Sequence, residues 1–334
     1  MKDSMKRKKL KRIIAIASAS LLVFGVFKFD SPTIAHLCDL MSDEGCRIIE
    51  PIAEMLPLTE SVPLTIEKDP EDPQTPDQSP SAAAHLAQES DFVSNEYGAI
   101  DLSNAFKGYA TVLLTADTCD GFRCVVEGPR EKYYYPIEAN KAVTLPLSEG
   151  NGEYAVSLLK HIEGIRYEIK ITAKTVVTLD DKKAPFLISN PFVDWADAAD
   201  TIRKAEDLTS GMNSDQEKID AIYAWVVKNL EYDEEKAVSV SSGYLSDLDK
   251  TLKRKEGICL DYAALTAGML RSQGVPCQLV IGYVDDAYHA WISVYTEESG
   301  WQRMDPTLEA STGNSYFIRQ YIGDGSNYIP TRIY

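Results

Sequence analysis

Positive charge is scarce in this sequence, and its scarcity argues against one class of partner. The 334 residues carry 34 Lys and Arg against 51 Asp and Glu, a formal net charge of −17. Seven of the cations lie within residues 1–12, so the rest of the chain is more acidic still. Because an acidic surface repels phosphate backbones, we expect no nucleic acid partner. Hydrophobic residues, at 44%, are abundant enough for packed cores, which excludes a wholly disordered chain.

Histidine is also in short supply. There are four, His36, His85, His161 and His289, and only His289 falls in the C-terminal half. The sequence lacks the ligand spacing of common zinc sites and the regularly spaced acidic loop of an EF-hand. We therefore expect no cofactor and no metal ion.

A long uncharged run covers residues 13–27, directly after the basic cluster. As a helix, this run rises about 22 Å, less than the roughly 30 Å of the hydrocarbon layer. Leu10 and Phe29 lengthen it, and the flanking Lys and Arg stems can reach the interface. A cleaved secretory signal is the alternative, and it would make the protein secreted. We favour a retained single-pass anchor in the cell membrane, with a cytoplasmic N-terminus and extracellular C-terminal domains.

Composition divides the chain into four parts. Residues 1–29 form the basic tail and the anchor or signal helix. Residues 30–97 form a juxtamembrane segment and a linker, in which prolines alternate with acidic residues between 61 and 91, a pattern typical of an extended spacer. Residues 98–183 contain short strand candidates separated by turn residues, which predicts a small Ig-like antiparallel β-sandwich. Residues 184–334 mix helices and strands, so the predicted fold class is α+β.

The six cysteines fit an oxidising location. Cys119 and Cys124 flank an Asp-Gly turn between two strand candidates, so a disulfide could staple that hairpin. Cys38 and Cys46 could close a second small loop. The alternative is that all four are free thiols. Cys277 lies on the apolar side of a strand candidate, which is typical of a small buried hydrophobe.

Cys259 has a different setting, because it begins a helix candidate directly after Gly257 and Ile258. Unpaired backbone amides and the helix dipole favour an anion there, so this thiol should ionise readily, and the same amides can bind an oxyanion. The alternative is an ordinary cysteine at a helix start.

His289 favours the chemical interpretation, because an acid is predicted opposite it. With the turn placed over residues 295–299, His289 faces Asp305 on the next strand. Asp305 can then orient the imidazole so that its other nitrogen activates Cys259. A slip of one residue would turn Asp305 to the wrong face of the sheet.

Three segments resemble the transglutaminase-like superfamily: GICLDYA at 257–263, YHAW at 288–291 and WQRMDPT at 301–307. The resemblance covers roughly residue 184 to the C-terminus and implies a papain-like core. It implies that Cys259 is the nucleophile, His289 the general base and acid, and Asp305 the orienting acid. Ile292 departs from the Asn or small polar residue of many relatives, but it touches none of these three. Tyr232 and Tyr244 are candidates for the family's additional oxyanion-hole donor.

The resemblance also implies acyl transfer through a thioester. We expect a cell-surface enzyme that acts on protein or peptide amide bonds, a cysteine peptidase or amide hydrolase first and a protein-glutamine crosslinker second. One alternative is a catalytically silent binding or scaffold protein at the cell surface. Another makes Cys259, His289 and Asp305 ligands of a metal ion.

Overall fold

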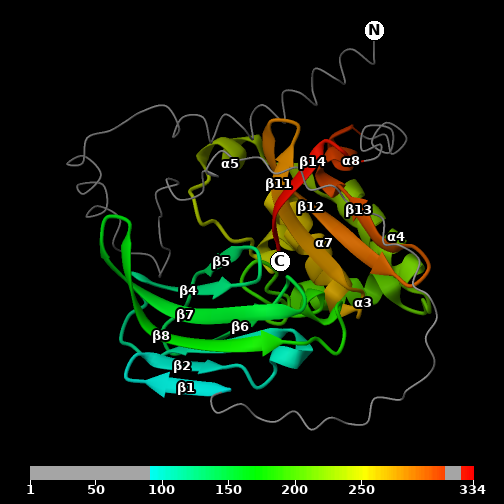
Figure 1. The fold of residues 1–334 in the computed structure, drawn as a ribbon. Helices are drawn as coiled ribbons and strands as arrows, with labels where there is room; N and C mark the ends of the chain where they lie inside the picture. Colours follow the sequence, from blue (N-terminus) through cyan, green and yellow to red (C-terminus); the bar gives the residue numbers. More distant parts are fainter. Residues whose placement is uncertain (1–90, 313–324) are drawn as a thin grey trace, which may run out of the picture.

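The computed structural model describes residues 91–312 and 325–334. The predicted anchor helix, the acidic linker and the Cys38–Cys46 pair lie outside the described residues. Within the described ranges, no helix combines the length and the apolar character needed to span a bilayer. The fold is mixed α and β, with a β-rich N-terminal part and a part of helices and strands after it (Figure 1).

The N-terminal part consists of two four-stranded antiparallel sheets. The first has the order β1-β2-β3-β6 and the second β5-β4-β7-β8. Successive residues of each strand point to opposite faces of the sheet, so one face can be apolar. In β3 every second residue, namely Ala110, Val112 and Leu114, is fully buried, and the residues between them are not. The strands are β1 (Phe92–Asn95), β2 (Gly98–Asp101), β3 (Tyr109–Leu114), β4 (Phe122–Glu127), β5 (Lys132–Tyr135), β6 (Ala142–Pro146), β7 (Gly152–Glu163) and β8 (Arg166–Val177), with a short 3-10 turn η2 (Ala105–Lys107).

The C-terminal part surrounds one helix with other helices and a four-stranded antiparallel sheet of order β13-β12-β11-β14. That central helix, α7, is buried at every position from Asp261 to Arg271, because Ala, Leu, Thr and Gly occupy all of its sides. The helices are α3 (Ala199–Thr209), α4 (Asp215–Asn229), α5 (Glu234–Ser239), α6 (Leu248–Arg254), α7 (Cys259–Ser272) and α8 (Pro306–Thr312), after a 3-10 turn η3 (Ala184–Phe186). The strands are β9 (Glu231–Tyr232), β10 (Glu256–Gly257), β11 (Cys277–Val284), β12 (Ala287–Thr296), β13 (Gly300–Met304) and β14 (Tyr328–Ile333).

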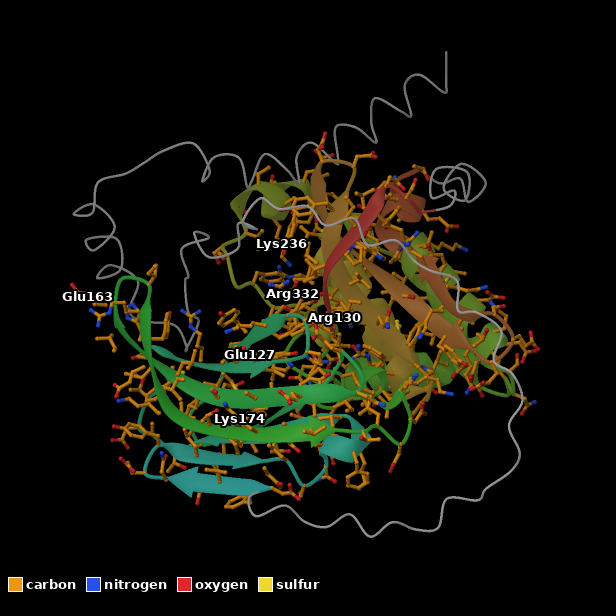
Figure 2. All side chains as sticks on the ribbon, viewed as in Figure 1. Glu127, Arg130, Glu163, Lys174, Lys236 and Arg332 are labelled. Carbon is orange, nitrogen blue, oxygen red and sulfur yellow. The ribbon has the colours of Figure 1, made fainter. Side chains whose placement is uncertain are left out.

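The two parts meet around Tyr334, which is 5% exposed. Its ring stacks on Phe192 with centroids 3.8 Å apart and meets the edges of Tyr133 and Tyr135 of β5. The buried Arg271 of α7 donates to the carbonyl oxygen of Tyr334 at 2.6 Å. At the rim, Arg332 of β14 pairs with Glu131 of the β4–β5 connection at 3.2 Å (Figure 2 labels Arg332). Tyr133 and Tyr135 of β5 therefore serve mainly in packing between the two parts, whereas Tyr134 is 40% exposed.

The predicted disulfide between Cys119 and Cys124 is wrong. Cys124 is a free thiol with no exposed surface, whereas Cys119 is disulfide-bonded to another cysteine. Cys124 lies in the middle of β4 opposite Tyr135, so its side chain packs in the sandwich core. The prediction for Cys277 is confirmed, since it is a fully buried free thiol at the start of β11.

The predicted register of β12 and β13 is wrong by two residues. Ser293 pairs with Arg303, and Tyr295 pairs with Trp301, because the turn comes one residue later than expected. Gly300 ends that turn with a left-handed φ of 64°, a conformation that glycine adopts without strain. Because the shift is even, the side chains keep their face of the sheet, and Asp305 stays on the face that carries His289.

Candidate active site

Cys259 lies at the first position of α7 and is partly exposed. The chain reaches it through β10, which pairs in parallel with β9 so that Gly257 lies beside Tyr232. A Cβ atom on Gly257 would approach the Cβ of Asp261 to 2.5 Å, so the approach to the helix requires glycine. The thiol is thus fixed at the amino end of a buried helix, where unpaired amides and the helix dipole favour an anion.

Asp261, on the first turn of α7, holds this helix start in place. It has no exposed surface and accepts four hydrogen bonds. The donors are Ile258 N (2.9 Å), Ser246 Oγ (2.8 Å), Tyr244 OH (2.6 Å) and Lys236 Nζ (2.7 Å). Lys236 comes from α5 and is labelled in Figure 2. Asp261 therefore connects α5 and the segment after it to the turn that carries Cys259.

His289 and Asp305 form a buried pair. The imidazole Nε2 lies 2.9 Å from Oδ2 of Asp305, with 7% of His289 and none of Asp305 exposed. Burial by itself would lower the pKa of His289, but the Asp305 carboxylate and the Cys259 thiol outweigh it and raise that pKa to about 10. The pair survives the register difference because a long side chain reaches its diagonal neighbour across a strand pair.

Cys259 is the second neighbour that acts on His289, because its thiol helps to raise the pKa of the imidazole. When the neutral imidazole carries its proton on Nε2, facing Asp305, Nδ1 is the nitrogen left to accept a proton. The structure thus pairs His289 with Asp305 and places Cys259 near the same imidazole.

Asp305 has two further partners. Its Oδ1 accepts from the backbone N–H of Leu308 at 3.0 Å and so caps α8. Its Oδ2 accepts from the hydroxyl of Tyr328 at 2.9 Å, in addition to His289. The sequence did not predict the role of Tyr328. The strand β14 joins the sheet beside β11, and no local sequence pattern indicates which residue of β14 contacts Asp305.

The two tyrosine candidates for an oxyanion-hole donor differ in position. The hydroxyl of Tyr244 is engaged with Asp261. Tyr232 lies near Cys259: its burial first, and then the neighbouring thiol, raise the pKa of Tyr232 well above its usual value. Tyr288 responds similarly to burial and to its neighbours Tyr283 and Cys259, and its pKa rises to about 12. Both phenols therefore stay protonated at neutral pH.

The other free thiols among the described residues are unlike Cys259. Burial raises the pKa of Cys277 to about 12, and it raises the pKa of Cys124 beyond that. Both are fully buried. Cys259 is the one free thiol of the described ranges with exposed surface.

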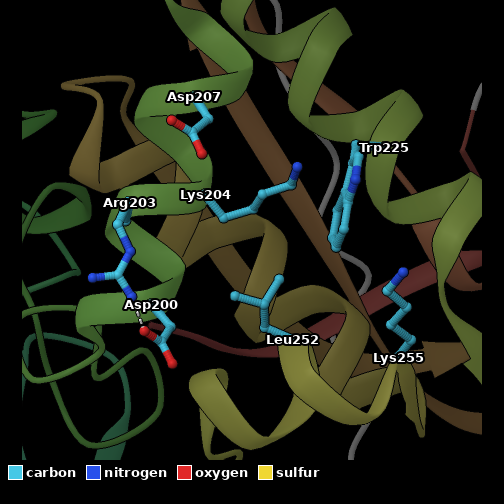
Figure 3. A pocket seen from close by; sticks show the side chains of 7 residues that line it. All are labelled: Asp200, Arg203, Lys204, Asp207, Trp225, Leu252 and Lys255. Atoms are coloured by element: carbon cyan, nitrogen blue, oxygen red, sulfur yellow. Dashed lines mark hydrogen bonds and ion pairs between the residues drawn. The ribbon is translucent and has the colours of Figure 1, made fainter.

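An open pocket lies on the helical side, away from these residues. It is lined by side chains of α3, α4 and α6 and of the residue after α6, and Figure 3 shows them: Asp200, Arg203, Lys204, Asp207, Trp225, Leu252 and Lys255. The ammonium of Lys204 lies 5.1 Å from the centre of the Trp225 ring. The lining includes none of the predicted site residues. Within residues 91–312 and 325–334, no group of three or more His, Cys, Asp and Glu side chains is arranged to hold a metal ion.

Comparison with known proteins shows what the region that carries the site is similar to. Residues 202–306 match the transglutaminase-like superfamily. The chain is 32% identical to the kyphoscoliosis peptidase of Mus musculus over 113 residues, which cover 30% of this chain and 17% of that protein. It is 32% identical to the protein-glutamine gamma-glutamyltransferase of Pseudomonas aeruginosa over 72 residues, 17% of this chain and 11% of that protein.

The chain is also similar, more distantly, to a solved structure. The periplasmic domain of TgpA from Pseudomonas aeruginosa is 14% identical, with a TM-score of 0.32, over 66% of this chain and 73% of that one. The chain spans under a fifth of the length of the two curated relatives above.

Proposed function

We propose that this chain, which contains a transglutaminase-like domain over residues 202–306, is a thiol-dependent acyl-transfer enzyme acting on protein or peptide amide bonds. In this proposal Cys259 is the nucleophile, His289 the general base and acid, and Asp305 the residue that orients the imidazole. One observation carries it: the buried imidazole bonds to Asp305 through Nε2 at 2.9 Å, and the Cys259 thiol helps to raise the pKa of the same imidazole.

The first half of the reaction forms a thioester. The thiol of Cys259 gives its proton to Nδ1 of His289, and the thiolate attacks the carbonyl carbon of an amide. Amides at the start of α7 stabilise the oxyanion that develops, and Tyr232 is the candidate for a further donor. The imidazolium then protonates the departing amine as the carbon–nitrogen bond breaks. Asp305 supports this step because its carboxylate stabilises the imidazolium.

The second half releases the acyl group. Nδ1 takes a proton from water, and the oxygen attacks the thioester carbon. The carbon–sulfur bond then breaks, the imidazolium returns the proton to the sulfur of Cys259, and a carboxylic acid leaves. When a primary amine replaces water, the product is a new amide. We rank hydrolysis first, and the mouse relative that is named a peptidase supports this order. The relative that is named a protein-glutamine gamma-glutamyltransferase supports the transfer reaction as the second candidate.

We further propose that the enzyme works outside the cell, attached by residues 13–27 and held off the membrane by the acidic linker. The basic cluster within residues 1–12 supports a cytoplasmic N-terminus. A secreted form, released by cleavage after the apolar run, is the other outcome. Fractionation of cells that express the full-length chain, followed by protease treatment of intact cells, distinguishes the two.

The reaction is tested in two steps on the full-length chain. Iodoacetamide at pH 6, with peptide mapping, should label Cys259 much faster than Cys277. A peptide mixture, incubated with and without a small primary amine, should then show cleavage, deamidation or amine incorporation by mass spectrometry. Cys259→Ala should abolish every product, and Cys124→Ala, which removes a free thiol of the sandwich, should abolish none.

Two results would reject the proposed function. If Cys259 reacts as slowly as Cys277, the imidazole does not activate it, and the catalytically silent binding protein becomes the better interpretation. If Cys259→Ala forms the same products as the unmodified chain, those products do not come from this site.

A further inference from the structure

The carboxylate of Asp305 shares one oxygen between two donors. Nε2 of His289 and the hydroxyl of Tyr328 both lie 2.9 Å from Oδ2, while Oδ1 accepts from the N–H of Leu308. All of this is closed to solvent: Tyr328 is 4% exposed and Asp305 is not exposed. Water therefore has little access to the carboxylate, and each donor takes a larger share of its charge than it would in solution.

Contacts other than Asp305 fix the ring of Tyr328. The β14 register places Tyr328 opposite Val284 of β11. The ring meets the Trp291 ring edge-on, with centroids 5.1 Å apart, and the guanidinium of Arg303 lies 4.8 Å from its centre. The hydroxyl is thus held at Oδ2 by packing, and it stays there whichever protonation state His289 adopts.

We propose that Tyr328 is a positioning residue of the site, whose hydroxyl divides the charge of Asp305 between itself and His289 and so limits how strongly the imidazolium is held. This inference rests on the proposed function of Cys259, His289 and Asp305. A general base must release its proton in each half of the reaction, and an undivided buried carboxylate raises the pKa of the imidazole away from neutral pH, where that release is most efficient. The hydroxyl of Tyr328 weakens the interaction between Asp305 and the imidazolium, and the imidazole still keeps Asp305 as its partner.

Other groups near the pair set the background for its titration. Cys259 of α7 helps to raise the pKa of His289. Tyr223 of α4 lies near Asp305 and Glu309 of α8, and burial and these carboxylates keep its pKa far above the usual value. Arg303 of β13 faces the Tyr328 ring, and Arg332 of β14 acts on Tyr288, beside His289 in the sequence. Tyr328→Phe leaves all of these charges in place.

The test compares full-length wild type with Tyr328→Phe, which keeps the ring and removes the hydroxyl. The rate at which iodoacetamide labels Cys259 is measured from pH 3 to pH 11, because the thiolate–imidazolium pair exists between two apparent pKa values. Without the phenol, Asp305 stabilises the imidazolium more strongly. The lower apparent pKa, at which the thiolate–imidazolium pair forms, should therefore fall, and the upper apparent pKa, at which the imidazolium loses its proton, should rise. A hydrogen bond of ordinary strength corresponds to a shift of up to about one pH unit. Tyr295→Phe, which removes a hydroxyl bonded to Glu297 on the same sheet, is the matched control and should leave the profile unchanged.

The outcomes separate this inference from the proposed function. The inference is supported if the pH range between the two apparent pKa values is wider in Tyr328→Phe and the temperature of thermal unfolding is unchanged or only slightly lower. The inference is overturned if that pH range is unchanged or narrower, because Tyr328 then acts through packing or by holding Asp305 in place. If wild-type Cys259 shows no ionisation below pH 8, the proposed function itself fails, whatever the variant does.

Discussion

Two carboxylates of the candidate site, Asp261 and Asp305, have no exposed surface, and they differ in the groups that they bind. Asp305 accepts from an imidazole, a phenol and one backbone N–H, whereas Asp261 accepts from an ammonium, a phenol, a hydroxyl and one backbone N–H. Both cap the start of a helix, α8 for Asp305 and α7 for Asp261. Asp261 and Asp305 are thus equally buried but bind different kinds of donor.

The difference lies in the chemistry of the partner. The charge of Asp305 acts on an imidazole, which gains and loses a proton in the proposed reaction. Asp261 instead forms an ion pair with Lys236, and this pair links α5 to α7. We infer that Asp305 contributes mainly to reactivity and Asp261 mainly to stability. The predictions below test this division.

Asp305→Asn should have the largest effect, on activity. The amide carries no charge to stabilise the imidazolium, and it favours the wrong tautomer of His289. We expect a loss of about 10³- to 10⁴-fold in kcat/KM, measured on a peptide found in the screen above, with a smaller change in unfolding. Normal turnover in this variant would contradict the role given to Asp305.

Asp261→Asn should have the largest effect on stability. It leaves the ammonium of Lys236 without its carboxylate and presents an amide group to other donors. We expect the free energy of unfolding in urea to fall by about 3 kcal/mol. Asp247→Asn is the matched control: Asp247 caps α6 through the N–H of Lys250 at the surface, and Asn caps a helix about as well as Asp, so this change should have little effect. Equal losses in the two variants would show that burial of Asp261 adds nothing.

The pH dependence of stability should report His289 and not Asp261. The folded-state pKa of His289 is raised to about 10, above the unfolded value near 6.5. Its contribution to stability is therefore complete below about pH 6.5 and is lost as the pH rises toward 10. Urea unfolding at a series of pH values should show this decline in wild type. It should be weaker in His289→Gln and in Asp305→Asn, and a decline of equal size in those variants would assign it to other groups.

Lys236→Met should have the smallest of these effects. Asp261 keeps its bonds to Tyr244, Ser246 and the N–H of Ile258, and Lys236 itself is 27% exposed. We expect unfolding to become easier by about 1.5 kcal/mol, with the pH profile of Cys259 labelling unchanged. A displaced labelling profile would mean that the Asp261 cluster also acts on the thiol, and the division between the two carboxylates would fail.

Local chemistry explains which elements the sequence predicts well. The helix predicted at Cys259 begins at that residue. Its signal lies in adjacent residues, so it is complete within the sequence. The β12–β13 register depends on a turn conformation that several loop lengths allow, and there the prediction is off by two residues. It kept the correct face only because the error was even.

The sequence by itself determined which residues of the C-terminal part could carry chemistry: a thiol at a helix start, a lone histidine in that half of the chain, and an acid on the following strand. Only the tertiary structure decided what surrounds them. Tyr328 reaches Asp305 from a strand that enters the sheet on the far side of β11, and Lys236 reaches Asp261 from a separate short helix. Such contacts depend on how elements pack, and a hydrogen bond between residues distant in the chain leaves no pattern in their spacing.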